Sequence, residues 1–246
     1  SKLVRLAALF AAFANIAAII GTHSRGGLVT LIATSALLIL GTKQRLTGLT
    51  LIACGVALMV ALAPSSWTER MGTIQEADKD SSFMTRVEAW QVSSAIALSN
   101  PLTGGGLHSV QIQSVWERFK GSKGLLPFVD VGFVSDYRRA AHSIYFEVMG
   151  DMGLSGIIIF LALLINGMFN SRRLAMLVKG RESEFEWAID LSRTLTAVMF
   201  AFMVGGLTVS VAYSEVIYTV IMLSEVLRGE IANTIAQQQT QATKIV

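Results

Sequence analysis

Long apolar segments are the feature that most constrains how this chain of 246 residues can fold. A helix needs roughly 20 mostly apolar residues to cross a bilayer. Five segments meet or approach that length: Leu3–Ile20, Gly26–Leu40, Leu46–Ala63, Ile144–Phe169 and Thr194–Tyr213. A sixth, Val216–Leu227, is shorter, and it either completes a crossing through its polar continuation or enters the membrane without crossing it. The sequence therefore predicts an all-α polytopic membrane protein with five to six transmembrane helices.

The composition agrees with a membrane protein and excludes several other classes. Charged residues make up 15% of the chain and hydrophobic residues 52%, whereas a soluble domain has about 25% charged residues. The net charge of +3 is not gathered into Lys/Arg runs, so we expect no nucleic-acid partner. The single cysteine, Cys54, excludes an intrachain disulfide. Because the chain opens on Ser1 and on an apolar segment too long for a signal peptide, we expect it to be a piece of a larger protein.

Short basic connections predict how the chain is oriented in the membrane. Basic residues flank the first apolar segment, follow the second, and recur within 172–193. Such residues are enriched in cytoplasmic loops, which places the long segment after the third helix on the outer face. The sequence thus divides into four parts: three transmembrane helices in 1–63, an outer loop region in 64–141, two to three transmembrane helices in 142–227 and a cytoplasmic tail in 228–246.

The outer loop region contains structure of its own. Apolar and small residues recur at helical spacing from Thr85 to Leu98 and predict an amphipathic helix, which Asn100-Pro101 ends. The following Leu102–Gly106 stretch is a turn whose glycines can adopt positive φ. Aromatic residues are enriched where proteins meet the membrane interface. We therefore expect the loop to rest on that interface through a set of aromatic side chains: Trp67, Phe83, Trp116, Phe119 and Phe128.

Three motifs with chemically useful side chains fall on the predicted outer face. Ser24 and Arg25 precede two glycines at the start of the second apolar segment. Arg86 lies in the loop helix, and His142 and Tyr145 lie at the mouth of the fourth segment. Guanidinium groups bind phosphate oxygens through paired hydrogen bonds, and an imidazole can accept a proton near neutral pH. Two arginines and one histidine at one face therefore suit a substrate that carries a diphosphate.

Each of these candidates also has a purely structural interpretation. Arg25 can extend its charge toward the interface from a helix end. Arg86 can form a solvated pair with Glu88 or with a neighbouring acid. His142 can be no more than a polar residue at a helix start. The residues alone leave these alternatives open.

The acidic residues and the other histidines are interpreted as mainly structural. Asp78-Lys79-Asp80 matches the Asp-x-Asp pattern of metal-dependent glycosyltransferases, but a solvated stretch is the simpler interpretation. Glu147 and Asp151 are four residues apart and share a helix face, where we expect helix packing or arginine pairing first and acid–base chemistry second. We interpret two histidines as bystanders: His23 and His108. The residues therefore predict no metal site.

Four motifs, in this order, resemble the O-antigen ligase/polymerase superfamily. They are Thr22-x-Ser24-Arg25-Gly26-Gly27, Arg86-x-x-x-Trp90, Asn100-Pro101-Leu102-Thr103-Gly104-x-Gly106 and His142-Ser143-x-Tyr145-x-x-x-Met149-Gly150-x-x-Gly153-x-x-Gly156. The residues around His142 most resemble the branch of exosortase A-associated O-glycosylation ligases. The resemblance covers the chain from its second apolar segment onward. Members of the superfamily have more spans than this chain, so it resembles their C-terminal half.

The resemblance implies a bacterial inner-membrane enzyme that moves a glycan from undecaprenyl diphosphate to an acceptor hydroxyl at the periplasmic face. Carried over by motif, Arg25 and Arg86 would hold the diphosphate, and His142 would be the base that activates the acceptor. Ser24 and Tyr145, in the same motifs, are further substrate-binding candidates. The superfamily is described as metal-independent, which implies no cofactor. A serine follows His142 where many relatives have asparagine, a difference that bears on the type of acceptor.

Two other functions remain as alternatives. A polymerase of the same superfamily shares the chemistry and adds one lipid-linked glycan to another, so these residues do not separate it from a ligase that uses a glycan, lipid or protein acceptor. A non-enzymatic lipid-binding or transport protein would use the arginines to recruit anionic headgroups. That function predicts polar residues within several spans, whereas Thr194–Ala212 carries no charge.

Overall fold

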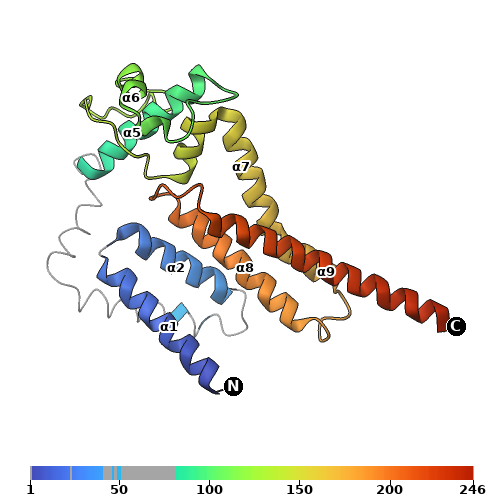
Figure 1. Cartoon of the computed structure of the whole chain (residues 1–246). Helices are drawn as coiled ribbons and strands as arrows, with labels where there is room; N and C mark the ends of the chain where they lie inside the picture. The colour runs from blue at the N-terminus through green and yellow to red at the C-terminus, as the bar shows by residue number, and fades with distance from the viewer. Residues whose placement is uncertain (1, 23, 41–45, 47–48, 51–80, 246) are drawn as a thin grey trace.

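The computed structural model describes residues 2–22, 24–40, 46, 49–50 and 81–245. The third predicted span lies almost entirely outside these residues. Every regular element in the described parts is helical, which confirms the all-α prediction. In chain order (Figure 1), the elements are α1 Lys2–Gly21, α2 Arg25–Leu40, α5 Ser81–Ser99, a short 3₁₀ helix η2 Ser109–Gln111, α6 Gln113–Phe119, α7 Ile144–Leu177, α8 Glu186–Gly205 and α9 Glu215–Ile245.

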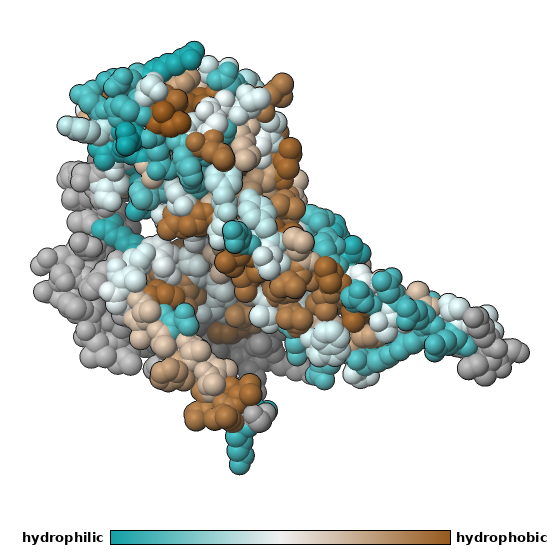
Figure 2. Space-filling model, viewed as in Figure 1, coloured by the Kyte–Doolittle hydropathy of each residue, from teal (hydrophilic) through white to brown (hydrophobic). Residues whose placement is uncertain are grey.

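Three of the described helices are long and apolar enough to cross a membrane: α1, α7 and α8. α2 is a shorter apolar helix that packs against α8. Figure 2 shows hydrophobic residues over the helical bundle, between a hydrophilic part that contains α5 and α6 and the hydrophilic end of α9. This distribution fits a membrane protein with a polar region outside the bilayer, while the total of five to six spans stays a prediction.

The fourth predicted span is not one straight helix. α7 breaks at Gly153, whose φ of 73° and ψ of −167° are not helical. A Cβ atom there would lie 2.5 Å from the carbonyl oxygen of Pro101, so only glycine fits. The break divides α7 into a first segment, residues 144–152, and a second segment, residues 154–177. The second segment is long enough by itself to span a bilayer, which leaves the first segment free to belong to the polar region around α5.

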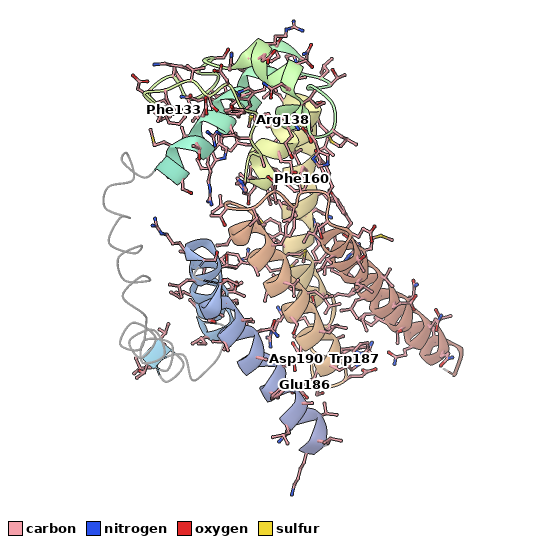
Figure 3. All side chains as sticks on the ribbon, turned by 60° about the vertical axis from the view of Figure 1, so that its left-hand side comes forward. Phe133, Arg138, Phe160, Glu186, Trp187 and Asp190 are labelled. Carbon is pink, nitrogen blue, oxygen red and sulfur yellow. The ribbon has the colours of Figure 1, made fainter. Side chains whose placement is uncertain are left out.

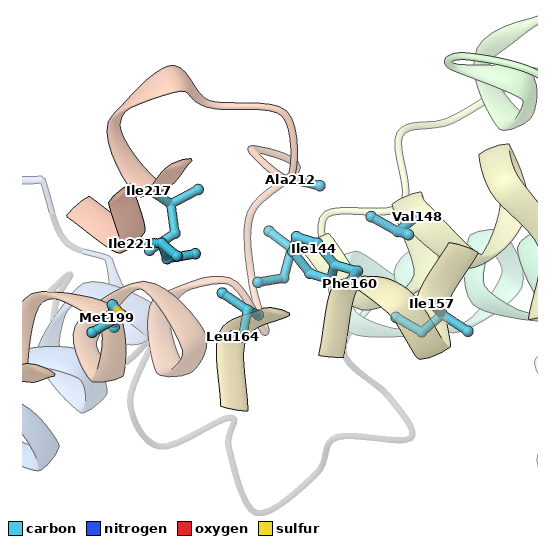
Figure 4. Packing of buried hydrophobic residues seen from close by; sticks show 9 residues of the cluster. All are labelled: Ile144, Val148, Ile157, Phe160, Leu164, Met199, Ala212, Ile217 and Ile221. Carbon is cyan, nitrogen blue, oxygen red and sulfur yellow. The ribbon is translucent and has the colours of Figure 1, made fainter. Parts of the chain in front are cut away.

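Two apolar clusters hold α7, α8 and α9 together. The first cluster contains residues from both sides of the α7 break and from α8 and α9, and Figure 4 shows Ile144 beside Phe160 within it. The second lies where α7 turns into α8, and there Leu227 and Ile231 of α9 pack with Leu174 and Phe185. The predicted sixth span therefore continues as one helix into the segment predicted to be the tail, without a break at Leu227.

The polar region is built around α5, which confirms a helix over Thr85–Leu98, whereas the predicted amphipathic character of that helix is wrong. Residues on several sides of α5 are buried because α7 packs on one side and η2 and α6 pack on another. One part of the membrane-interface prediction is wrong. Trp116 is fully buried in a cluster with Val92 and Ile96, and its indole donates a hydrogen bond to the carbonyl of Ser135. Phe83 and Phe128 are exposed as expected, and Trp67 lies outside the described residues.

Candidate functional site

The turn that carries His142 is held from both sides by α5 and by the end of α8. Trp90 donates an indole hydrogen bond of 2.7 Å to the carbonyl of Ala141 and stacks on Phe146 at 5.0 Å between ring centroids. The amide of Ile144 donates to the carbonyl of Gly206 at 2.8 Å. His142 itself has a positive φ of 46°, an uncommon conformation for a non-glycine residue. These contacts bring the Trp90 and His142 motifs together in the structure.

Arg86 lies one helical turn before Trp90 and acts electrostatically on His142. Partial burial lowers the pKa of His142, and the positive charge of Arg86 lowers it further. The Arg86–Glu88 pair considered above is not formed. Glu88 is buried and accepts a hydrogen bond of 2.6 Å from the amide of Ser135, and its other carboxylate oxygen lies 3.6 Å from Nε of Arg139. Within the described parts of the chain, no carboxylate forms a salt bridge with Arg86.

Arg25 opens α2 at the same end of the bundle. The next residue, Gly26, packs so closely on Thr208 that a Cβ atom would lie 2.2 Å from the Thr208 hydroxyl. Thr208 belongs to the α8–α9 connection, which begins at the same Gly206 that accepts the hydrogen bond from Ile144. The first turns of α2 and α7 therefore contact one connection. This arrangement brings Arg25 and His142 to one end of the helices.

Ser24 and Tyr145 use their hydroxyl groups within the fold. The Ser24 hydroxyl accepts a hydrogen bond of 3.1 Å from the amide of Gly27 and thereby caps the start of α2. The Tyr145 hydroxyl donates at 2.8 Å to the carbonyl of Met203 and ties α7 to α8. Their predicted contacts with substrate stay predictions.

Glu147 and Asp151 serve packing, as the first of their two interpretations predicted. The Asp151 carboxylate accepts hydrogen bonds from the amides of His108 and Ser109, at 2.8 and 2.9 Å, and from the hydroxyls of Ser109 and Tyr213. The Glu147 carboxylate accepts a hydrogen bond of 3.0 Å from the amide of Ala212. Both acids are buried. Through these bonds, two parts of the chain are held against the first segment of α7. One is the backbone that follows the Leu102–Gly106 turn, called the glycine turn below, and the other is the α8–α9 connection.

His108 is placed much closer to these acids than its interpretation as a bystander predicted. Its Nδ1 lies 3.9 Å from a carboxylate oxygen of Glu147, its ring packs edge-on against Tyr213, and its side chain is 60% exposed. Like His142 it has a positive φ, of 55°. The one feature of the sequence that could have drawn attention to His108 was its position two residues after Gly106. The partners that surround it lie too far along the chain to be recognised by spacing.

Two of the sequence interpretations fall outside the described residues. These are the bystander role of His23 and the Asp78–Asp80 stretch. Within the residues that the structure describes, no group of three or more His, Cys, Asp or Glu side chains is arranged to hold a metal ion.

Comparison with known proteins tests the family directly. No curated protein matches the chain. The family model for O-antigen ligase matches residues 10–161, which is more than half of the chain. The matched region includes Arg25, Arg86 and His142, together with the glycine turn and the first segment of α7. The chain therefore belongs to the O-antigen ligase family.

Proposed function

We propose that this protein transfers a glycan from undecaprenyl diphosphate to an acceptor hydroxyl at the periplasmic face of the bacterial inner membrane. Family membership indicates the broader class, a bacterial membrane glycosyltransferase that acts on lipid-linked glycans. The observation that carries the finer proposal is the Trp90 hydrogen bond to Ala141, because it holds the His142 turn against the helix that presents Arg86.

The two arginines would bind and stabilise the leaving group. The bond between the sugar C1 and the diphosphate oxygen breaks, the acceptor oxygen forms a new bond to C1 from the opposite side, and the configuration at C1 inverts. Negative charge develops on the departing diphosphate. Fixed guanidinium groups of Arg25 and Arg86 would stabilise that charge more in the transition state than in the ground state.

His142 would accept the proton of the acceptor hydroxyl. Partial burial and Arg86 both lower its pKa and so favour the neutral imidazole, which has the lone pair that a base needs. A bound diphosphate would offset the charge of Arg86 and make the imidazole more basic in the substrate complex. Arg86 would therefore couple donor binding to activation of the acceptor.

The two ends of the bundle differ in a way that supports an outer-face site. Figure 3 shows Phe133 and Arg138 at one end and Glu186, Trp187 and Asp190 at the other. The first end contains α5, to which the His142 turn is bound. The second contains the α7–α8 connection, whose basic residues favour the cytoplasm. This difference supports the proposal that the candidate site faces the periplasm.

Purified full-length protein with a lipid-diphosphate glycan and a panel of glycan, lipid and protein acceptors tests the proposal. Replacing Arg86→Lys keeps the charge but removes the paired donors, and we expect kcat to fall by about 10²-fold or more. For His142→Ala we expect a loss of about 10²–10⁴-fold. Arg193→Lys, an exposed arginine of α8 paired with Asp190, is the matched control.

Full transfer by the Arg86→Lys protein would contradict the proposed role of that residue. The product identifies the acceptor class: a lengthened lipid-linked glycan indicates the polymerase, and glycan on a separate lipid or protein indicates the ligase.

A further inference from the structure

A pocket of about 440 Å³ lies between the end of α5, the glycine turn and α6. Its volume falls in the range of small-molecule sites, roughly 300–1,000 Å³. No function given above uses it. The residues that matter for its chemistry are Asn100, Gly104, Gly105, Ser114, Arg118 and Phe119.

The lining combines a guanidinium, an amide and a hydroxyl group, all able to form hydrogen bonds, with an aromatic ring. Arg118 holds its guanidinium over the ring of Phe119, 5.4 Å from the ring centroid. Within the described parts of the chain, this guanidinium forms no salt bridge, so its donors are available to a ligand. Asn100 and Ser114 are exposed and add an amide and a hydroxyl. Because the lining contains no carboxylate, it suits a polar, uncharged or anionic ligand rather than a cation.

The pocket is rigidly connected to the first segment of α7. The amide of Gly105 donates to the carbonyl of Gly150 at 2.9 Å, and the amide of Gly106 donates to the carbonyl of Asp151 at 3.0 Å. His142 precedes Gly150 by eight residues in the sequence. Because α7 starts at Ile144, six helical residues, about 9 Å at 1.5 Å per residue, separate the His142 turn from the point at Gly150 where the glycine turn that lines the pocket is bound. A ligand that reaches both must therefore be extended.

We propose that this pocket is a carbohydrate subsite that binds a sugar remote from the reacting one, in an oligosaccharide whose reacting end lies at His142. The inference rests on the proposed transfer reaction, since that reaction brings a glycan to His142. Both the donor and the acceptor can carry such a glycan. The subsite would select for chain length, because only glycans longer than the distance to His142 would occupy it.

Two variants impair binding in the pocket in different ways. Ser114→Phe fills it from an exposed position, and Arg118→Met removes the guanidinium but keeps an apolar side chain. Glu117→Phe is the matched control, because Glu117 is exposed on the same helix and does not line the pocket. Thermal unfolding of each purified protein establishes that the variants are folded.

Transfer is measured with long and short glycans on the donor at a fixed acceptor, and then with long and short acceptors at a fixed donor. We expect both pocket variants to raise KM about tenfold for the long glycan, with KM for the short glycan and kcat unchanged. If the increase in KM occurs when the donor glycan is varied, the donor occupies the pocket, and if it occurs when the acceptor is varied, the acceptor does. Equal changes for long and short glycans, or no change, would overturn the proposal.

Direct binding of the free oligosaccharide to wild-type protein, Ser114→Phe and Glu117→Phe separates this inference from the reaction itself. Absence of transfer by the wild type would refute the proposed function. Loss of binding in Ser114→Phe alone would support the subsite even then, and equal binding by all three proteins would refute it.

Discussion

At the scale of single residues, two histidines share an unusual backbone conformation. Of the non-glycine residues that the structure describes, His108 and His142 have positive φ. This region is uncommon for non-glycine residues, although histidine enters it more readily than most. Each is held there by its neighbours, since Trp90 binds the carbonyl before His142 and Asp151 binds the amide of His108. Strain of this kind gathers at functional sites, which agrees with the role proposed for His142.

The first prediction concerns the pH dependence of transfer. Because partial burial and Arg86 lower the pKa of His142, the neutral base persists to a lower pH than for an ordinary histidine. We expect kcat/KM to rise with pH along an acid limb centred below about 6.5. In Arg86→Gln, loss of the positive charge raises the pKa of His142 and moves this limb to higher pH. The residual activity of the variant, measured across the pH range, provides the comparison.

Two outcomes would count against this account. If the acid limb of kcat/KM lies at the same pH in Arg86→Gln as in the wild type, Arg86 does not act on the base. A profile without an acid limb in the wild type would remove His142 from the proton transfer. Arg193→Gln controls for the general loss of one positive charge, since Arg193 lies on exposed α8 surface.

Residue types and motif order selected Arg25, Arg86 and His142 as candidates, because paired cations and an imidazole have recognisable chemistry, and their roles stay predictions. The position of His108 beside Glu147 and Tyr213 could not be predicted, since these contacts exist only once three distant segments meet. The burial of Trp116 was also missed. We expected this aromatic residue of a polar loop at the membrane interface. Instead, its indole donates a hydrogen bond to the Ser135 carbonyl within the same loop, which allows the ring to be buried there.

At the scale of secondary-structure elements, the main surprise is the break in α7. Hydropathy predicted an uninterrupted span over Ile144–Phe169, because the hydropathy of a long apolar segment is not changed by one residue with non-helical backbone. The break depends on contacts between distant glycines. Gly104, with a φ of 63°, lies against the carbonyl of Asp151, and Gly153 lies against that of Pro101. The glycines of two separate motifs are therefore required by one backbone-to-backbone contact.

This contact leads to the second prediction. In Gly153→Ala and Gly104→Ala, the added Cβ would lie 2.5 Å from backbone atoms, and positive φ adds roughly 1–2 kcal/mol of strain. We expect each variant to lose about 2 kcal/mol or more of folding stability. Thermal unfolding in detergent measures this loss. Unchanged melting of both variants would show that the turn and α7 do not pack as described.

A glycine in an ordinary helical setting provides the control for these variants. Gly229 lies within α9 and has open space around its Cα. Alanine favours a helix over glycine by about 1 kcal/mol. Gly229→Ala should therefore melt at the same temperature as the wild type or above it.

At the scale of the whole molecule, hydropathy and charge anticipated the separation into an apolar bundle and a polar region at one end of it. The helical class and the superfamily are confirmed. The number of spans could not be settled from the sequence, since α2 is short and α9 becomes polar after Leu227. The narrower exosortase A-associated branch and the four-part division of the chain stay predictions. The apposition of the glycine turn and α7 arises only from long-range packing.

The last prediction tests the orientation on which the periplasmic site depends. In a Cys54→Ser background, single cysteines replace Tyr137, a 79% exposed residue of the polar region, or Ser183, an exposed residue of the α7–α8 connection. Basic residues around the second position favour the cytoplasm. A membrane-impermeant maleimide should therefore label Tyr137→Cys in intact spheroplasts and Ser183→Cys only after lysis. The reverse pattern would place His142 in the cytoplasm, because the His142 turn and the segment that carries Tyr137 are both bound to α5. Labelling of both positions before lysis would mean that the α7–α8 pair does not cross the membrane as a hairpin.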